Sequence, residues 1–295
     1  MTNDQDAAAK SLSKIFSDVD KPENEYLVAS RGVLRGLIAP LLSQMGLTET
    51  TTVPVDLLDG ACGTGLLTQE VQDILPRDVL ERSTILCGDN SEQMIAIVKR
   101  RIAAEGWDTG LPENSFSHVG LGLALHLIPD ADAVLADEAA ALTKPLADCK
   151  RILKPGGILG ATTFHATNTF WIPDLRSAFA SLPFDAPFPA MLGTQTQRWA
   201  DAAWVEEHLR AQGFADVEVT VCKGKYRVGG GDEFVQAFGT MIAWVASAWW
   251  SAETLEAHPL VEVGELVRRH LEEKYGGEGW DIDYSVICMT GRVGE

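Results

Sequence analysis

Short apolar runs alternate with amphipathic stretches along the first half of the chain. Four runs have the length and composition of buried strands, and they lie at residues 53–59, 83–89, 116–124 and 157–164. Helical spacing of apolar residues follows the first run at 66–75, before Pro76, and follows the second run at 91–107. Strands that alternate with helices predict parallel pairing. The expected fold class is therefore α/β, with a doubly wound, mostly parallel sheet and helices on both faces.

The two ends of the chain follow other patterns. Residues 1–50 carry apolar side chains at helical spacing, which predicts N-terminal helices. Two late strands are expected at 216–228 and 283–293, with a helical insert at 233–275 between them. Hydrophobic residues make up 46% of the chain, which is enough to fill a core.

The chain is strongly acidic, with 42 acidic and 24 basic residues and a formal net charge of −18. Such a surface repels phosphate backbones, and the local basic cluster Lys99-Arg100-Arg101 is expected on a solvated helix face. We therefore expect no nucleic-acid partner. The longest apolar run, 241–250, is far shorter than the roughly 20 residues that span a bilayer, so we expect no membrane partner either.

The cysteines and the N-terminus indicate the cellular compartment of the protein. Five cysteines are scattered along the chain without a C-x-x-C pair, which argues against a disulfide framework and against a zinc site. No cluster of His, Asp and Glu has metal-ligand spacing, so we expect no metal. The polar N-terminus lacks the apolar core of a signal peptide. The predicted location is the cytoplasm.

A glycine-rich turn, within LLDGACGTGLLTQEV at 57–71, joins the first predicted strand to the first predicted helix. A dinucleotide-binding turn would follow G-x-G-x-x-G, but Thr68 occupies the position of the third glycine. A phosphate-cradling P-loop would place a lysine after its last glycine, where Leu66 stands. Both phosphate-binding interpretations fail, and a nicotinamide oxidoreductase is disfavoured.

Two carboxylates stand at the ends of the first two predicted strands. Asp59 ends the first strand and can accept a hydrogen bond from a ligand ammonium. Asp89 ends the second strand, and a carboxylate at such a position can accept from both hydroxyls of a ribose. Together these two positions indicate a ligand with an amino-acid part and a ribose part.

At these motifs the sequence resembles the class I S-adenosylmethionine-dependent methyltransferases, which have a Rossmann-like sheet. The matching pieces over about residues 50–165 are LLDGACGTG, CGDNSEQMI, LPENSFSHV and CKRILKPGG, in the order of the family. Later pieces, among them TTFHATNTFWIPDLRSAF and RWADAAWVEEHLRAQGFADVEV, resemble the fungal small-molecule branch of the ubiquinone-methyltransferase-like enzymes. The resemblance implies S-adenosyl-L-methionine as the cofactor.

The resemblance assigns parts of the cofactor to positions of this chain. Asp59 would bind the methionine part, Asp89 the ribose, and Asp108 the adenine amino group. The other implied cofactor-binding residues are Gly60, Ala61, Gly63 and Gly65 around the methionine part, Asn90 and Met94 beside the adenosine, and Leu121 and Gly122 on the sulfonium side.

The resemblance also implies how the chain is organised. It predicts an N-terminal helical lid at 1–50, a cofactor-binding core at 51–165, and substrate-side helices with C-terminal strands at 166–295 that complete the same domain. Tyr26 in the lid and Trp171 after the fourth strand are candidate substrate-binding residues, with core packing as the alternative for both.

Two stretches depart from the pattern of the family. Between Trp107 and Phe116 there is no room for a further strand with its loops, which raises the expectation that one edge strand is missing. Asp108 therefore matches the adenine-binding acid only by its place in a shortened loop. Residues 138–148 look like an insertion, since removing them would restore the usual spacing.

Two histidines are candidate catalytic residues. A phenol, alcohol or thiol acceptor needs a general base, whereas a free amine or a thiolate needs none. His126 and His165 follow the third and fourth predicted strands, at the edge where ligands bind in open α/β sheets. A packing role is the alternative for both. His118 lies within a strand and is expected to be structural.

The resulting prediction is an enzyme that transfers a methyl group from S-adenosylmethionine to O, N or S of a small apolar natural product. The alternative is a protein of the same fold that binds the cofactor without methylating, such as a pericyclase-like enzyme or a regulatory subunit. The sequence leaves the acceptor and the oligomeric state open.

Overall fold

A computed structural model of the chain describes residues 34–89, 116–125, 146–147, 149–190 and 198–294. The described residues divide into two compact units. The first, here called the sheet unit, lies within Leu34–Ala166, Thr196–Cys222 and Val286–Glu295. The second, here called the helical unit, lies within Thr167–Gln195 and Lys223–Ser285.

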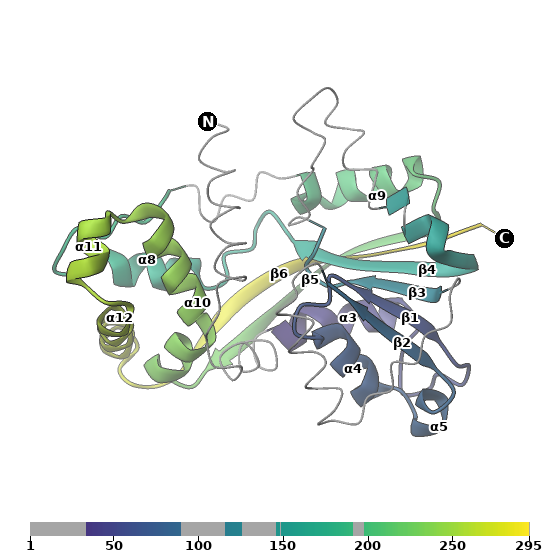
Figure 1. Ribbon diagram of the computed structural model, residues 1–295, viewed down its shortest axis with the longest axis horizontal. Coiled ribbons are helices and arrows are strands. Elements are labelled where there is room, and N and C mark those ends of the chain that lie inside the picture. The colour runs from purple at the N-terminus through teal and green to yellow at the C-terminus, as the bar shows by residue number, and fades with distance from the viewer. Residues whose placement is uncertain (1–33, 90–115, 126–145, 148, 191–197, 295) are drawn as a thin grey trace. The chain divides into compact units, whose positions relative to one another are not determined.

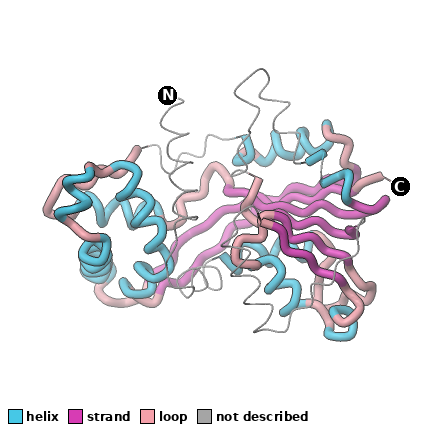
Figure 2. Tube along the Cα trace, in the orientation of Figure 1, coloured by secondary structure: helices cyan, strands magenta, loops and turns pink. Residues whose placement is uncertain are grey.

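Six strands of the described residues form one sheet (Figures 1 and 2). They are β1 (Asp56–Gly60), β2 (Thr84–Gly88), β3 (Phe116–Leu121), β4 (Leu153–Phe164), β5 (Ala215–Val228) and β6 (Trp280–Arg292). Their order across the sheet is β2-β1-β3-β4-β6-β5. β1 pairs in parallel with β2 and β3, and β3 with β4, whereas β6 runs antiparallel to β4. The predicted α/β fold with a mostly parallel sheet is confirmed.

Helices cover both faces of the sheet in the sheet unit (Figure 1). Its helical elements are α3 (Arg35–Gln44), α4 (Leu66–Ile74), α5 (Arg77–Leu80), η2 (Arg198–Ala200) and α9 (Ala202–Ala211). On the face toward α9, large apolar side chains of the sheet form one buried cluster with that helix. Its members include Val119, Leu121, Leu159, Ala161, Val205, Leu209, Ile287 and Met289.

The opposite face of the sheet carries glycines where α3 and α4 pack. A Cβ atom on Gly120 would lie 2.7 Å from Leu67 Cδ1 of α4. A Cβ on Gly160 would lie 2.3 Å from the sulfur of Met45, the residue that ends α3. Met45 is itself buried. The absence of side chains at these two strand positions therefore lets both helices approach the sheet closely.

The helical unit contains the predicted helical insert together with one earlier helix. Its helices are α8 (Ile172–Ala180), α10 (Gly231–Trp249), α11 (Ala252–Ala257) and α12 (Leu260–Tyr275). The buried carboxylate of Asp174 on α8 accepts hydrogen bonds from Lys274 Nζ at 2.8 Å, Tyr275 Oη at 2.6 Å and Trp280 Nε1 at 2.8 Å. These bonds tie α8 to the end of α12 and the start of β6, and they satisfy a charge that would otherwise be costly to bury.

Several predicted strands have shifted bounds in the structure, among them the last, which runs from Trp280 to Arg292 instead of 283–293. The strand expected from residue 53 begins only at Asp56, where pairing with β2 starts. The strand expected to end at residue 124 stops at Leu121, because the chain turns at Leu123 in the left-handed region (φ 54°). The fourth strand begins at Leu153 instead of residue 157, through its pairing with Phe116.

Several sequence predictions lie outside the described residues. They include the N-terminal helices up to residue 33, the helix at 91–107 and the shortened stretch between Trp107 and Phe116. Within the described part of the chain, β2 is the outermost strand next to β1. Among the described residues, no helix is long and apolar enough to cross a membrane.

The close approach of α3 to β4 gives a first prediction. Gly160→Ala should lower the free energy of unfolding by about 1 to 3 kcal/mol, because its methyl group overlaps the buried Met45 side chain. The measurement is urea unfolding of the two single variants and of Gly160→Ala/Met45→Ala. The double variant should lose less free energy of unfolding than the two single variants lose together. Strict additivity of the two losses would contradict the contact. Gly88→Ala, whose Cβ would come no closer than 3.9 Å to Leu58, is the matched control.

Candidate functional site

The carboxyl ends of the parallel strands bring the predicted cofactor-binding residues of the described chain to one edge of the sheet. Asp59 and Gly60 close β1, Asp89 follows β2, and Leu121 and Gly122 stand at the end of β3. β1 pairs with both neighbouring strands, so these segments lie side by side at that edge (Figure 1). Ligands of open α/β sheets bind at this kind of edge.

The glycine-rich turn has a left-handed backbone at three positions. Ala61, Gly63 and Gly65 have φ values of 52°, 53° and 80°. A Cβ on Gly63 would meet no atom of the described residues within 4 Å, whereas a Cβ on Gly60 would lie 2.8 Å from Leu121 Cδ2. A side chain at position 60 would thus displace Leu121 of β3, whereas Gly63 suits the left-handed conformation of the turn.

Backbone amides tie this turn to the end of β2. The Cys62 N–H donates to the Gly88 carbonyl at 2.9 Å, and the Gly63 N–H donates to Oδ2 of Asp89 at 2.8 Å. The Gly65 N–H donates to the Cys62 carbonyl at 2.8 Å and closes the turn before α4 begins. The Asp89 carboxylate therefore lies directly against the turn that follows β1.

The Asp59 carboxylate is buried at the other side of the turn. Its Oδ2 accepts hydrogen bonds from the backbone N–H of Thr68 at 3.0 Å and from Thr68 Oγ1 at 2.8 Å. Burial raises the pKa of Asp59 to about 6, although both bonds from Thr68 act in the opposite direction. No cation of the described residues lowers this pKa, so the ammonium of an amino-acid ligand would supply the counter-charge that the carboxylate lacks.

Thr68 and Cys87 are members of this network that the sequence did not single out. Thr68 occupies the position of the missing third glycine, and it binds Asp59 from the first turn of α4. Its Oγ1 also lies 3.1 Å from Cys87 Sγ on β2, and Cys87 is the register partner of Asp59. Only the pairing of β1 with β2 and the path of the turn bring these side chains together, so sequence spacing carries no signal for them.

The other candidates divide into placed and unplaced residues. His165 directly follows β4 and is half-buried at the same carboxyl edge. Trp171 belongs to the helical unit, where it is buried at the start of α8. The remaining candidates lie outside the described residues, and they are Tyr26, Asn90, Met94, Asp108 and His126.

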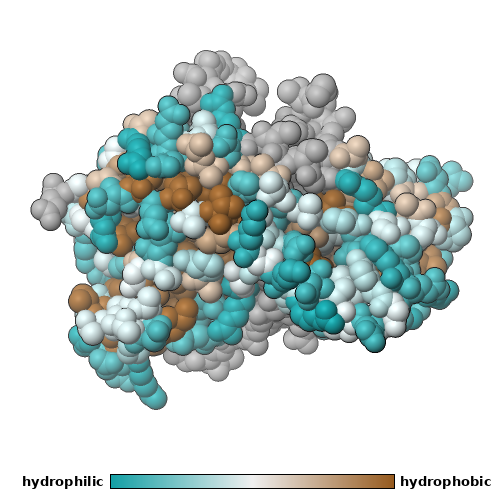
Figure 3. Space-filling model, turned by 180° about the vertical axis from the view of Figure 1, so that it is seen from behind, coloured by the Kyte–Doolittle hydropathy of each residue, from teal (hydrophilic) through white to brown (hydrophobic). Residues whose placement is uncertain are grey.

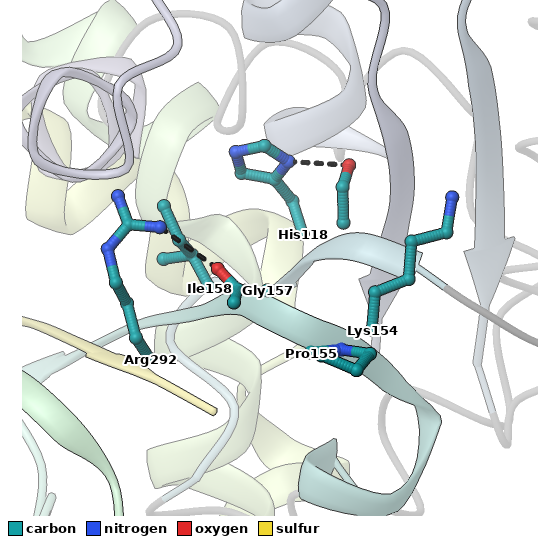
Figure 4. Close-up of a pocket in the computed structure, with 8 residues that line it drawn as sticks. His118, Lys154, Pro155, Gly157, Ile158 and Arg292 are labelled. Carbon is teal, nitrogen blue, oxygen red and sulfur yellow. Dashed lines mark hydrogen bonds between the residues drawn. The ribbon is translucent and has the colours of Figure 1, made fainter. Parts of the chain in front are cut away.

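His118 lies near the opposite, amino end of β3, and its Nδ1 is 2.8 Å from Ser117 Oγ. It lines a shallow hollow of about 160 Å³ together with Lys154 and Arg292 (Figure 4). Arg292 donates to the Gly156 carbonyl, and Lys154 lies 2.5 Å from Asp56, so neighbouring groups already bind both cations. Burial lowers the pKa of His118 to about 4. This neutral histidine is placed away from the carboxyl edge.

The surface seen from behind carries no uniform type of residue. Hydrophobic and hydrophilic residues are interspersed on this face (Figure 3). Among the described residues, no group of three or more His, Cys, Asp and Glu side chains could hold a metal ion.

Comparisons with known proteins agree with the motif-based resemblance. Residues 58–161 match the family model described as a methyltransferase domain. The chain is 28% identical over 253 residues to the methyltransferase tpcH of Aspergillus fumigatus, covering 81% of this chain and 84% of that protein. It is 29% identical over 248 residues to the methyltransferase ktnA of Aspergillus niger, covering 76% and 79%. It is 24% identical over 267 residues to the acetylaranotin bis-thiomethyltransferase of Aspergillus terreus, covering 85% and 87%.

The partly buried His118 predicts a specific acid sensitivity. Its pKa is lower in the folded chain, at about 4, than the ordinary value of 6.5, so the unfolded chain binds more protons between these values. The free energy of unfolding should therefore fall as pH falls from 6.5 toward 4, by about 2 to 3 kcal/mol at pH 4.5 from this group.

The measurement is urea unfolding of wild type and His118→Asn at pH 7 and pH 4.5. Asparagine can still accept a hydrogen bond near the position of Nδ1 but does not titrate. The wild type should lose more stability than the variant over this interval. Equal losses would mean that His118 is not held neutral by burial.

Proposed function

We propose that this chain is a class I S-adenosylmethionine-dependent methyltransferase, and that its carboxyl-edge site binds S-adenosylmethionine for methyl transfer to a small apolar natural product. The acceptor atom is an oxygen, nitrogen or sulfur. The observation that carries this proposal is the convergence of Asp59 and Asp89 on one glycine-rich turn. One carboxylate would bind the amino-acid end of the ligand and the other its ribose.

Each part of the turn has its own task in this proposal. Asp59 receives the ammonium of the methionine part, which compensates its buried charge. Asp89 accepts hydrogen bonds from the ribose hydroxyls while one of its oxygens keeps the Gly63 N–H bound. The open space beside Gly63 lets the ligand approach the backbone.

The chain's contribution to the reaction is chiefly positioning. S-adenosylmethionine supplies a methyl group on a positively charged sulfur, which is already an excellent leaving group. Aligning an acceptor atom about 3 Å from that methyl group can therefore supply much of the rate. We further propose His165, half-buried at the carboxyl edge, as the base for acceptors that must lose a proton. His126, which lies outside the described residues, is proposed for the same task from its place in the sequence after β3.

The substrate side is proposed from the helical segments. Tyr26 would contribute from the N-terminal segment before α3, and Trp171 would contribute a flat apolar wall. Trp171 follows Phe170, whose ring packs edge-on against Phe238 at 5.4 Å, so the start of α8 is rich in aromatic side chains. One of the related proteins is by name a thiomethyltransferase, which supports testing thiols alongside phenols and amines.

The buried Asp59 predicts pH-dependent cofactor binding. Its pKa of about 6 in the free chain means that the carboxylate becomes neutral as pH falls below 6 and loses its attraction for an ammonium. The dissociation constant for S-adenosylmethionine should therefore rise about tenfold between pH 7 and pH 5. Isothermal titration at both pH values is the measurement.

Two variants decide whether Asp59 is the cause. Asp59→Asn should bind weakly at pH 7 and lose the pH dependence, because asparagine does not titrate. Asp56→Asn changes a carboxylate at the amino end of the same strand, where it pairs with Lys154, and should behave like wild type. The same pH dependence in Asp59→Asn and wild type would contradict the assignment.

Loss of the ribose contact gives a direct test of the site. Asp89→Ala removes both the proposed ribose acceptor and the bond to the Gly63 N–H, so affinity for S-adenosylmethionine should fall by at least about tenfold. Asp78→Ala, which removes an exposed acid on α5, should bind like wild type. Unchanged affinity in Asp89→Ala would refute the proposed site.

Methyl transfer itself is tested with methyl-labelled S-adenosylmethionine and a panel of aromatic phenols, thiols and amines. Wild type and Asp78→Ala should place label in the same product, detected by intact mass, whereas Asp89→Ala should label it much more slowly. Tight cofactor binding without label in any acceptor would count against methyl transfer to these acceptor classes.

A further inference from the structure

The turn after β3 contains a strained residue at the proposed site. Leu123 has φ 54°, a left-handed conformation that places the Cβ of an ordinary residue too close to the backbone. The turn after β1 shows the same feature at Ala61, with φ 52°. Both turns lie at the carboxyl edge of the sheet. Conformations of this kind persist only where the surrounding structure holds them, and they cluster at functional sites.

One side chain on the next strand holds the turn at Leu123. The Leu123 N–H donates a hydrogen bond to Oγ1 of Thr162 on β4 at 3.0 Å. Thr162 is fully buried, and its backbone pairs with Cys288 of β6. The acceptor is therefore rigid, whereas the residue that it holds lies in a turn beyond the last pair of the β3–β4 ladder, Leu121 and Ala161.

The turn has little freedom on its other side. A Cβ on Gly122 would lie 3.0 Å from Ile38 Cδ1 of α3, which is buried. The backbone of Gly122 is thus close to α3, while the next residue is bound to β4. Losing the bond to Thr162 would leave the N–H of a strained residue unpaired and would allow the turn to relax toward an ordinary conformation.

We propose that Thr162 is a positioning residue for the cofactor site, because its hydroxyl holds the turn at residues 121–123 in the conformation that lines the sulfonium side. The inference rests on the proposed function, and on the family resemblance that implies Leu121 and Gly122 on the sulfonium side of the cofactor. Thr162 itself acts through the turn, so its contribution should appear in cofactor binding as well as in stability.

The test begins with two substitutions at Thr162. Thr162→Val keeps the shape of the side chain but removes the acceptor, and it should raise the dissociation constants of S-adenosylmethionine and S-adenosylhomocysteine about tenfold. Thr162→Ser keeps the hydroxyl and should bind both within about threefold of wild type. Isothermal titration is carried out well below the unfolding midpoint of each variant.

A neighbouring threonine provides the matched control. Thr163 is equally buried on β4, but its Oγ1 donates to the Trp199 carbonyl at 2.7 Å instead of holding the turn. Thr163→Val should lower the unfolding temperature while leaving both dissociation constants unchanged. Similar dissociation constants in Thr162→Val and Thr163→Val would show that a general loss of stability explains the effect, and they would overturn the proposal.

A second-site change tests the role of backbone strain. Leu123→Gly makes the left-handed conformation inherently accessible, so the turn should no longer depend on Thr162. The double variant Thr162→Val/Leu123→Gly should therefore regain most of the affinity lost in Thr162→Val. Failure of Leu123→Gly to restore any affinity would also overturn the proposal.

Asp89→Ala separates this inference from the proposed function. If Asp89→Ala abolishes cofactor binding and Thr162→Val does not weaken it, only the role of Thr162 is refuted. If Asp89→Ala binds like wild type, the proposed cofactor site itself is refuted, whatever Thr162→Val does.

Discussion

The buried bond between Asp59 and Thr68 is the interaction on which the site depends. It joins the end of the first strand to the first turn of the following helix. The five residues 61–65, between the end of β1 and the start of α4, therefore form a compact turn. The bond also leaves a carboxylate buried without a cation among the described residues that could neutralise it. The same interaction thus shapes the turn and holds a buried negative charge that a ligand ammonium would compensate.

Both strained turns and close packing contribute to the structure of the carboxyl edge. Gly60, Gly63 and Gly65 allow approach and left-handed turns at no steric cost, whereas Ala61 and Leu123 adopt such turns at a cost. The difference matters because a glycine turn is determined locally, while a strained one depends on distant partners. On the face of the sheet opposite α9, glycines instead let α3 and α4 approach the strands that end at the site.

The sequence predicted the fold class and the resemblance to a family better than it predicted where each strand ends. Alternating apolar runs predicted the strand–helix alternation, because parallel strands buried on both faces are nearly continuous in hydrophobic residues. Strand bounds shifted at Asp56, Leu121 and Leu153, where pairing or a left-handed turn, not hydrophobicity, ends the ladder. The acids at 59 and 89 could be singled out because each is the last residue of a predicted strand, and the roles assigned to them stay predictions.

The sequence by itself determined the fold class, the type of turn after β1 and the two carboxylates that stand beside it. These features are local, since each depends on neighbouring residues. Only the tertiary structure decided what holds them. Thr68 reaches Asp59, Asp89 reaches the Gly63 N–H, and Thr162 reaches Leu123 from 39 positions away. The physical reason is that hydrogen bonds and close packing between strands depend on register and burial, which the order of residues along the chain does not display.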